Sequence, residues 1–412
     1  MRTTAILDRL STLRGADLVW MPLTVALLGL SWRELHRIVF ILLALYGVYQ
    51  LIRHGREAWA DPPVRRLTLL FACLWLPMLA SWPDAVDPDR SLSAIGRYLV
   101  YLLAGIGLLR LPWSASGAHR LRWGLFAILA FWTLDGIYQF MTGVNLLGYP
   151  IFPGGRLTGM FENSPRLGLM LATLSPLWYE TVRRLSARWP LAWSLLIPLV
   201  AIVLLGGSRA SWMIFVVGAV LYVWYLTRLA GQVIDYKAWA WRGGILLVVA
   251  GVLIAQLDWL SSRVEVLGNL TSGEYAAIDA ATSGRLPRWQ AFAGMFAEHW
   301  FNGVGVRNYA LVYLAQGGQS SANDIYGHPH LFFGEIAAET GLIGLLGYLA
   351  FLVLVMRRFL ASPALVATPW LIAVLLASFP LSSTLSFYSL FWSTLLWLLV
   401  LAWLSVERQS AG

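Results

Sequence analysis

The sequence predicts an all-α integral membrane protein with about 12 transmembrane helices. Of its 412 residues, 58% are hydrophobic and only 12% are charged, and the mean hydropathy is +0.67. A soluble protein of this length could not bury so much apolar surface. The apolar residues also fall into runs close to the length that crosses a bilayer, joined mostly by short polar segments. Twelve such runs lie at residues 17–31, 38–52, 67–82, 92–109, 122–140, 167–182, 189–206, 210–227, 243–260, 331–355, 363–381 and 385–405.

A long segment of mixed polarity interrupts this series between the ninth and tenth runs. We therefore expect nine spans within residues 1–260, a large outer loop region with short helices over 261–330, and three more spans within 331–412. The first run follows a basic lead-in and lacks a small-residue cleavage site, so it predicts a retained anchor rather than a cleaved signal peptide. Cys73 is the only cysteine, which excludes an intramolecular disulfide and a cysteine-based metal site.

Cationic side chains gather in alternate loops, and this bias sets the orientation. With the N-terminus in the cytoplasm, 19 of the 30 Lys and Arg residues fall on cytoplasmic loops, whereas the outer loop PDAVDPD at 83–89 is acidic. The bias predicts an even number of spans with both termini in the cytoplasm. Seven arginines depart from the trend and fall on the outer side: Arg156, Arg166, Arg209, Arg263, Arg285, Arg288 and Arg307.

Arginine supplies nearly all of the basic charge. Lys237 is the only lysine against 29 arginines, and the formal net charge is +9. One explanation is a GC-rich genome, and the other is that planar, bidentate guanidinium groups suit the recognition of phosphate. The positive-inside trend accounts for the cytoplasmic arginines but not for the outer ones, which favours an anion-binding role for the latter.

The first outer arginines stand next to turns. Arg156 and Arg166 project from GGRLTGMFENSPRLG (154–168), where a solvated interfacial loop with snorkelling arginines is the alternative interpretation. Arg209 separates two apolar runs in GGSRASW (206–212), at a boundary where an unpaired charge is costly, about 2.5–3.5 kcal/mol near a helix centre. We expect Ser208 to cap the helix that follows, so that its N-terminal amides add to an anion site. A snorkelling arginine at a helix end is the alternative for Arg209.

Arg285 and Arg288 form a pair in the long outer segment, within SGRLPRW (283–289). At spacing i, i+3 they share a face of any helix formed there, and two guanidinium groups could hold two oxygens of one diphosphate. A solvated pair is the alternative interpretation.

Two histidines precede the tenth apolar run, in GHPHLFFGEIAAETG (327–341). Pro329 suits a first helical turn, so we expect a helix from about 329–331 with His330 in that turn. The helix N-terminus would keep the imidazole neutral and available as a proton acceptor. Glu335 and Glu339 point roughly 140° and 180° away from His330 on a regular helix, which makes them poor orienting partners. An interfacial histidine that is merely hydrogen-bonded is the alternative.

His328 is the weaker candidate of the two. It precedes Pro329 in an extended or turn conformation, where it either assists His330 or is solvated. A His-x-His pair could bind zinc, but no third ligand follows at a convincing spacing, so we predict no metal site.

Four of these motifs together resemble the O-antigen ligase family of bacterial inner membranes, a superfamily shared with O-antigen polymerases and protein O-oligosaccharyltransferases. They are Arg156-Leu-Thr-Gly159, Ser208-Arg-Ala-Ser211 opening a span, Ser283-Gly-Arg285 in a large outer loop, and the segment from Pro329 to Gly344. The chain departs from the family pattern where His-Asn is common, because it has His330-Leu331.

The resemblance implies a glycosyltransferase that uses a lipid carrier, with catalytic elements in the 261–330 region facing the periplasm. The donor would be a glycan on undecaprenyl diphosphate and the acceptor a sugar hydroxyl of lipid A–core, with membrane lipids around the protein and no metal, nucleotide cofactor or nucleic acid. The arginines and histidines of these motifs fit this chemistry. A leaving diphosphate gains negative charge, which guanidinium groups stabilise, and an attacking hydroxyl needs a base, which an imidazole can supply. We predict His330 as the base, Arg209, Arg285 and Arg288 as the first diphosphate ligands, and Arg156 and Arg166 behind them.

Other functions stay open at this stage. A polymerase would use a lipid-linked glycan as acceptor, and an oligosaccharyltransferase would use Ser or Thr of a protein; both share the same motifs. A flippase or transporter for anionic lipids would explain the arginines but not the histidine beside them, and transporters typically carry charge at the midplane and related halves. The oligomeric state is not predicted.

Overall fold

The computed structural model describes residues 20–32, 35–111, 113–228, 236–271, 273–318, 327–361 and 366–411. Within these ranges the chain is helical, with two isolated β-bridges and no strand. This confirms the predicted all-α class. The basic lead-in with Arg2, Arg9 and Arg14 lies outside the described residues. The elements are α2 (Trp20–Leu28), α3 (Leu35–His54), α4 (Arg56–Ala60), α5 (Pro62–Ala80), α6 (Pro88–Arg110), α7 (Ala115–Thr142), α8 (Leu167–Ser186), η2 (Pro190–Leu195), α9 (Leu196–Leu205), α10 (Arg209–Thr227), α11 (Tyr236–Gln256), α12 (Asp258–Glu265), η3 (Val266–Thr271), α13 (Tyr275–Ala281), α14 (Leu286–Glu298), α15 (Tyr309–Ala315), α16 (Phe332–Ala361), α17 (Thr368–Ala377) and α18 (Leu390–Ala411).

Each of the twelve predicted apolar runs contains a helix, but the helices differ in length. Seven in the described ranges are long and apolar enough to cross a membrane, namely α3, α5, α6, most of α7, α10, α16 and most of α18. By length and composition these seven helices are candidate membrane spans, consistent with a multi-pass helical membrane protein. The total of twelve stays a prediction, because α2 and α17 have only 9 and 10 residues and α8 carries charged residues in its last turn.

Two C-terminal helices form the centre of the bundle. All ten residues of α17 are buried, and it packs against α8, α10, α16 and α18. Three large side chains of α18, Trp392, Trp397 and Trp403, are also fully buried. The apolar character of these helices therefore serves the protein core more than contact with lipid.

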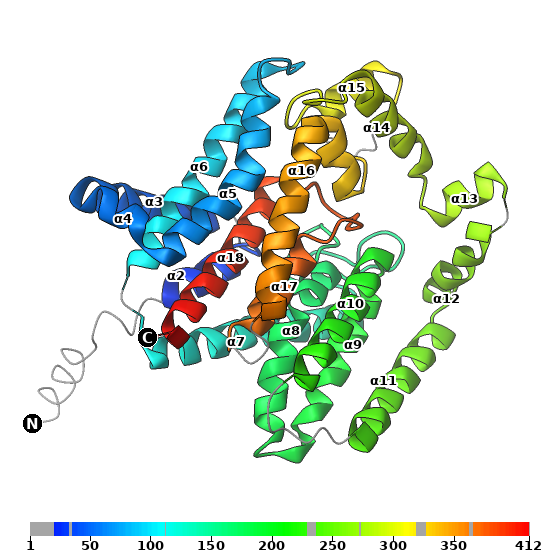
Figure 1. Cartoon of the computed structure of the whole chain (residues 1–412). Helices are drawn as coiled ribbons and strands as arrows, with labels where there is room; N and C mark the ends of the chain where they lie inside the picture. The colour runs from blue at the N-terminus through cyan, green and yellow to red at the C-terminus, as the bar shows by residue number, and fades with distance from the viewer. Residues whose placement is uncertain are drawn as a thin grey trace, which may run out of the picture.

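Residues 258–271 and 273–318 form an arch of short helices. In Figure 1, α12 and α13 lie at the flank next to α11, and α14 and α15 lead across the top to α16. Helix α14 packs along the first part of α16, where the small residue Gly334 lets the Phe292 ring approach closely. A Cβ at Gly334 would lie 2.8 Å from that ring, so the small residue at the start of this helix admits a neighbouring helix.

Helix α16 is broken at Gly341, whose φ of 62° leaves the helical region. The loop before α15 fills the break: Leu342 N donates to Trp300 O at 2.8 Å, and Val304 N donates to Ala338 O at 2.9 Å. A Cβ at Gly341 would lie 2.5 Å from the Phe301 backbone, so only glycine fits here. The break thus docks the arch onto the bundle.

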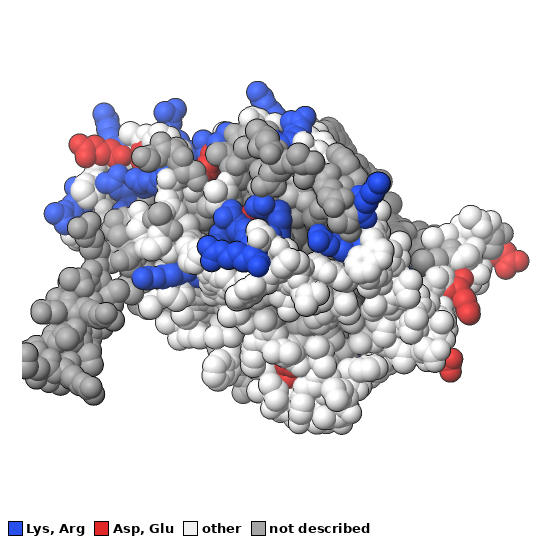
Figure 2. Space-filling view, turned by 90° about the horizontal axis from the view of Figure 1, so that it is seen from below, with Lys and Arg blue, Asp and Glu red and all other residues white. Residues whose placement is uncertain are grey.

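Basic side chains from distant parts of the chain meet at the opposite end of the bundle. Arg66 and Arg358 both pair with Glu407, the first at 2.7 Å, and Arg408 pairs with Asp61 at 3.2 Å. Figure 2, seen from below the view of Figure 1, shows Lys and Arg gathered over part of this face, with few acidic residues among them. Three arginines that the charge bias assigned to the cytoplasm therefore share one end of the molecule.

Candidate active site

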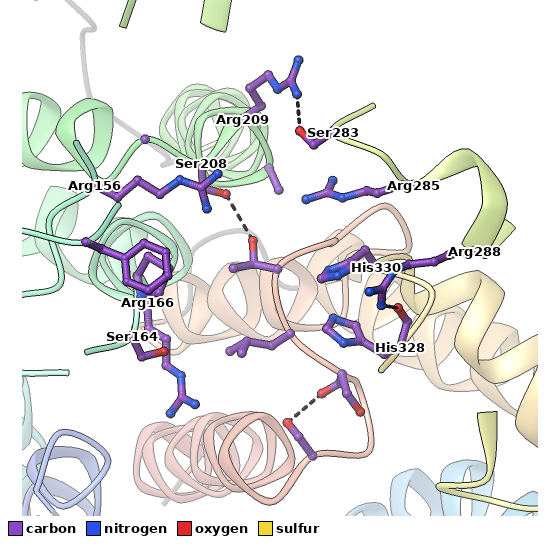
Figure 3. Close-up of a pocket in the computed structure, with 18 of the residues that line it drawn as sticks. Arg156, Ser164, Arg166, Ser208, Arg209, Ser283, Arg285, Arg288, His328 and His330 are labelled. Carbon is purple, nitrogen blue, oxygen red and sulfur yellow. Dashed lines mark hydrogen bonds between the residues drawn. The ribbon is translucent and has the colours of Figure 1, made fainter. Parts of the chain in front are cut away.

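A cavity of about 570 Å³ opens at the other end of the bundle, where α8, α10, α14, α16 and α18 begin. It collects residues from Phe152 to Ser389, which lie 237 positions apart in the sequence. No Asp or Glu is among the described residues that line it. The lining includes six of the seven outer arginines and both histidines of the 327–341 segment: Arg156, Arg166, Arg209, Arg285, Arg288, Arg307, His328 and His330 (Figure 3). The side chain of Arg263 lies outside the described part of the chain.

Three helix N-termini meet at this cavity. The residues that precede α8, α10 and α14 are Arg166, Ser208 and Arg285, and all three line it. None of them caps its helix with a side-chain hydrogen bond. The prediction that Ser208 caps α10 was wrong, because its hydroxyl lies 3.2 Å from Thr384 Oγ1 instead. Backbone N–H groups at uncapped helix starts, together with the helix dipoles, favour an anion in the cavity.

Short polar contacts hold three of the arginines in place. Arg285 Nη1 donates to Ser383 Oγ at 2.9 Å, Arg307 Nη1 donates to Ser386 Oγ at 3.1 Å, and Arg209 donates to Ser283 Oγ. These partners are neutral hydroxyls, so these three contacts cancel no positive charge. The buried atoms Arg156 Nε, Arg166 Nε and Arg209 Nη1 have no hydrogen-bond partner within the described ranges.

The crowding of guanidinium groups is costly without a ligand. Burial, and then the neighbouring charges of Arg209, Arg156 and Arg288, lower the pKa of Arg285 to about 10. Burial and the charge of Arg209 also lower the pKa of Arg156. Arg285 is still charged at neutral pH, but its charged form is disfavoured, and a bound anion would relieve that cost.

The loop that carries the histidines is anchored from α14. Arg288 is buried, donates from Nη1 to His328 O at 3.1 Å, and lies over the Tyr313 ring at 5.4 Å. Trp289 Nε1 donates to Pro329 O at 3.0 Å. Two consecutive residues of α14 thus fix two consecutive peptide groups of the loop.

His330 lies outside the helix, contrary to the prediction that it occupies the first turn. Helix α16 starts at Phe332, and His330 has a φ of 52°, in the left-handed region that non-glycine residues seldom adopt. The reason is tertiary: Phe332 N donates to Ser382 O at 3.2 Å, which ties the helix start to the 378–389 loop rather than continuing the helix backwards.

The hydrogen bond of the His330 ring defines its useful nitrogen. His330 Nδ1 lies 2.9 Å from the carbonyl oxygen of Ser383, and a carbonyl oxygen only accepts, so Nδ1 carries the proton. In the neutral ring the lone pair is then on Nε2, which suits a proton acceptor. The His328 ring lies beside it, with the two ring centres 4.0 Å apart.

Two buried carboxylates of α16 organise the loops around the cavity. Glu339 accepts from Arg307 N at 2.6 Å and from Tyr309 N at 3.1 Å. Glu335 accepts from Ser386 Oγ at 2.5 Å and from Phe387 N at 2.8 Å. As expected, neither bonds to His330. They fix the backbone on which Arg307 and Ser386 are presented.

Several lining residues were not singled out from the sequence. Arg307 carried a usable signal, because it belongs to the outer arginine set, but its surrounding segment has no distinctive motif. Ser164, Thr384 and Ser386 carried none, since hydroxyl residues are common in loops. No group of three or more His, Cys, Asp or Glu residues in the described ranges is arranged to hold a metal ion.

The fold and the cavity define a multi-pass helical membrane protein with a cationic, histidine-containing pocket at one end of its bundle. Residues 194–349 match the model of the family described as O-antigen ligase. The match confirms the predicted family and covers Arg209, Arg285, Arg288, His328 and His330 but not Arg156 or Arg166. Members of the family are glycosyltransferase-like enzymes. A comparison with curated proteins gave no match.

Proposed function

We propose that this protein is an O-antigen ligase: it transfers a glycan from undecaprenyl diphosphate to a sugar hydroxyl of lipid A–core and so completes lipopolysaccharide. The observation that carries the proposal is the cavity itself. Six guanidinium groups, three uncapped helix starts and a histidine with its acceptor nitrogen defined surround one space of about 570 Å³. That combination suits a diphosphate leaving group next to a hydroxyl that must lose a proton.

The arginines would bind the donor. When the bond between the anomeric carbon and the diphosphate oxygen breaks, negative charge grows on the departing diphosphate, and fixed positive groups stabilise that change. Arg209 and Arg285 are the first candidates, because their other contacts are to neutral serine hydroxyls. Arg156 and Arg166 lie on the facing side of the cavity (Figure 3) and would take the remaining phosphate oxygens. Arg288 would bind the diphosphate, and it would also position the loop of His328, to which it donates a hydrogen bond.

His330 would be the general base. The acceptor hydroxyl oxygen forms the new bond to the anomeric carbon, its proton passes to His330 Nε2, and the bonding electrons to the old oxygen leave with undecaprenyl diphosphate. Attack from the side opposite the leaving group inverts the anomeric centre. His328, with its ring beside that of His330, is an accessory candidate.

The same geometry supports a location. A bacterial inner membrane protein with both termini in the cytoplasm would place the paired arginines around Glu407 inside and the cavity at the periplasmic face. Helix α8 has 20 residues, Leu167–Ser186, and is therefore about 30 Å long, which is the thickness of a bilayer core; it begins after Arg166 at the cavity and carries Arg183 in its last turn. The donor would then be used at the periplasmic leaflet.

Substitution of the base gives the first test. We expect His330→Ala to abolish transfer while the protein still inserts in the membrane and still binds donor lipid. His299→Ala is the matched control, because His299 is exposed after α14 and does not line the cavity. A full O-antigen ladder in cells that rely on His330→Ala would refute the assignment. Arg288→Ala should weaken donor binding, and an unchanged affinity for the diphosphate lipid would remove Arg288 from the donor site.

A second experiment separates the ligase from its relatives. Purified protein and a synthetic undecaprenyl diphosphate glycan are offered lipid A–core, a lipid-linked glycan and a serine-containing peptide in parallel. Glycosylation of lipid A–core supports the ligase. Glycosylation of the lipid-linked glycan or the peptide would assign a polymerase or an oligosaccharyltransferase, and movement of the lipid without transfer would assign a transporter.

A further inference from the structure

A second cationic cavity lies at the opposite end of the bundle and takes no part in the proposed reaction. It has a volume of about 360 Å³ and lies between the start of α7, the last turn of α8, and the adjoining ends of α17 and α18. Its polar side is formed by His119, Arg122, Glu180 and Arg184, and its apolar side includes Trp370 and Val406.

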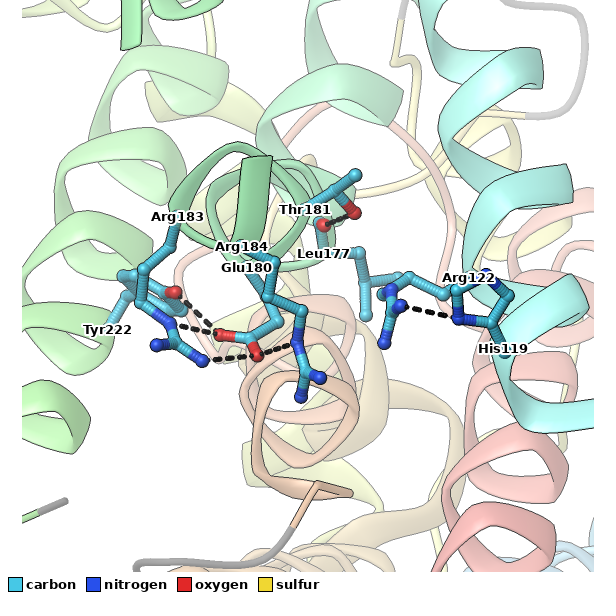
Figure 4. Close-up of polar contacts among 8 residues, drawn as sticks. All are labelled: His119, Arg122, Leu177, Glu180, Thr181, Arg183, Arg184 and Tyr222. Atoms are coloured by element: carbon cyan, nitrogen blue, oxygen red, sulfur yellow. Dashed lines mark hydrogen bonds and ion pairs between the residues drawn. The ribbon is translucent and has the colours of Figure 1, made fainter. Parts of the chain in front are cut away.

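Glu180 is the centre of a complete hydrogen-bond network on one side of this cavity (Figure 4). It is buried and accepts from Arg183 Nε at 2.9 Å, Arg183 Nη2 at 2.8 Å, Arg184 Nε at 2.5 Å and Tyr222 Oη at 2.8 Å. Both carboxylate oxygens are thereby satisfied. Two arginines share this single negative charge, so the network retains a net positive charge.

Arg122 faces this network from α7 without a carboxylate of its own. Its Nη2 is bonded to His119 Nδ1 at 3.0 Å, and its buried Nε has no hydrogen-bond partner among the described residues. Arg184 uses its Nε on Glu180, which leaves its terminal nitrogens for another acceptor. Two guanidinium groups from different helices therefore line one cavity, and each has N–H donors left for a ligand. Recognition of a phosphate requires such donors.

The shape of the cavity favours a lipid headgroup over a lone ion. Its volume is about a dozen times the roughly 30 Å³ that one water occupies in the liquid. One wall is apolar, with Leu177 from α8, Pro369 and Trp370 from α17, and Val406 from α18. A phospholipid presents the matching combination, with a charged phosphate next to its glycerol and acyl carbons, and basic pockets between helix ends are suited to such headgroups.

We propose that this cavity binds the phosphate headgroup of an anionic phospholipid, at the end of the protein away from the 570 Å³ cavity. Arg122 and Arg184 hold the phosphate between α7 and α8, and the Trp370 wall holds the start of the acyl chains. The bound lipid joins α7 to the α8–α10 network through Arg122. This site is independent of the proposed transferase reaction.

The test measures lipid binding to full-length protein purified in detergent. Native mass spectrometry and thermal unfolding are recorded with phosphatidylglycerol, with phosphatidylcholine and with inorganic phosphate. We expect phosphatidylglycerol to bind and stabilise the wild type, and Arg122→Gln to weaken that binding about five- to tenfold. Arg122→Lys keeps the charge but not the planar fork, so it should restore part of the affinity.

Arg188→Gln is the matched control. Arg188 follows α8 at the same end of the bundle, is exposed, and does not line the cavity, so its loss removes the same charge without a site residue. Equal weakening by Arg188→Gln and Arg122→Gln would overturn the proposal, since general attraction to the surface would then explain the binding. Equal binding of phosphatidylcholine would also overturn it, and so would inorganic phosphate matching the lipid's stabilisation. If Arg122→Gln does not fold, Arg184→Gln, which removes the second donor, serves in its place with the same expected outcome.

Discussion

Neutralising Arg285 should make the unliganded protein more stable and its anion affinity weaker at the same time. Arg285 lies at the start of α14, largely buried, with the charges of Arg209, Arg156 and Arg288 nearby. These surroundings lower its pKa well below the ordinary value of an arginine, to about 10, which corresponds to about 3 kcal/mol of unfavourable energy for the charged side chain in the folded protein. Arg285→Gln removes that energy and loses the hydrogen bond to Ser383 Oγ, worth about 1 kcal/mol.

The net stabilisation is therefore about 2 kcal/mol. An unfolding entropy of about 2.1 cal/mol/K per residue over the whole chain converts this into a Tm increase of about 2 °C. Because the pKa in the folded state is lowered, the penalty is fully present below about pH 10 and disappears as the pH rises above it. The advantage of Arg285→Gln over the wild type should shrink accordingly at high pH.

Anion binding should change in the opposite direction. A hydrogen bond to a charged partner contributes about 1.5–3 kcal/mol, so Arg285→Gln should bind inorganic diphosphate roughly 10- to 100-fold more weakly. Thermal unfolding followed by tryptophan fluorescence, with and without diphosphate, measures both effects in one sample. Arg90→Gln is the control, because Arg90 lies at the same end of the bundle in α6 but does not line the cavity. A lower Tm for unliganded Arg285→Gln, or an unchanged diphosphate affinity, would refute this account of the cavity.

Three further substitutions test the close backbone contacts that support the site and the packing of the bundle. Glu339→Gln turns its amide NH2 group toward one of the two backbone N–H donors, Arg307 N or Tyr309 N, that the carboxylate now accepts from. We expect the free energy of unfolding to fall by about 1–3 kcal/mol and glycan transfer to be reduced in a ladder assay. Gly303→Ala should prevent folding or lower Tm strongly, because φ is 74° and the new Cβ would lie 2.4 Å from the Glu339 backbone. Gly294→Ala is its control: Gly294 lies within α14 in open space, so this substitution should leave Tm unchanged or raise it slightly. Gly47→Ala should separate α3 from α6, since its Cβ would lie 1.9 Å from Leu103 O, and protease sensitivity of detergent-solubilised protein would report it. Wild-type Tm values for Glu339→Gln, Gly303→Ala or Gly47→Ala would contradict the packing described.

The location of the helices could be predicted from the sequence with good success. Apolar runs of 15 to 25 residues are direct evidence of helices that avoid water, and each run does contain one. Their number as spans could not be predicted in the same way. Apolar composition does not distinguish a helix buried in protein, such as α17, from one that faces lipid, because both environments exclude water.

The candidate site was predicted in composition but not in local geometry. The outer arginines stood out because each contradicts the charge bias of its side, and the structure brings six of them to one cavity. His330 was assigned to a helical turn because Pro329 favours one, but its position depends on Ser383 and Ser382, more than 50 residues away. Local preferences of the chain carry no information about such partners.

The sequence by itself determined the all-α class of the protein, the location of its helices and the arginines that oppose the charge bias, since these depend on composition and on short-range pattern. Only the tertiary structure decided that Arg288 holds the histidine loop, that Glu335 and Glu339 hold the loops of Ser386 and Arg307, and that Ser208 does not cap its helix. The physical reason is that a buried polar group must find a partner, and in a folded bundle the nearest partner in space is seldom the nearest along the chain.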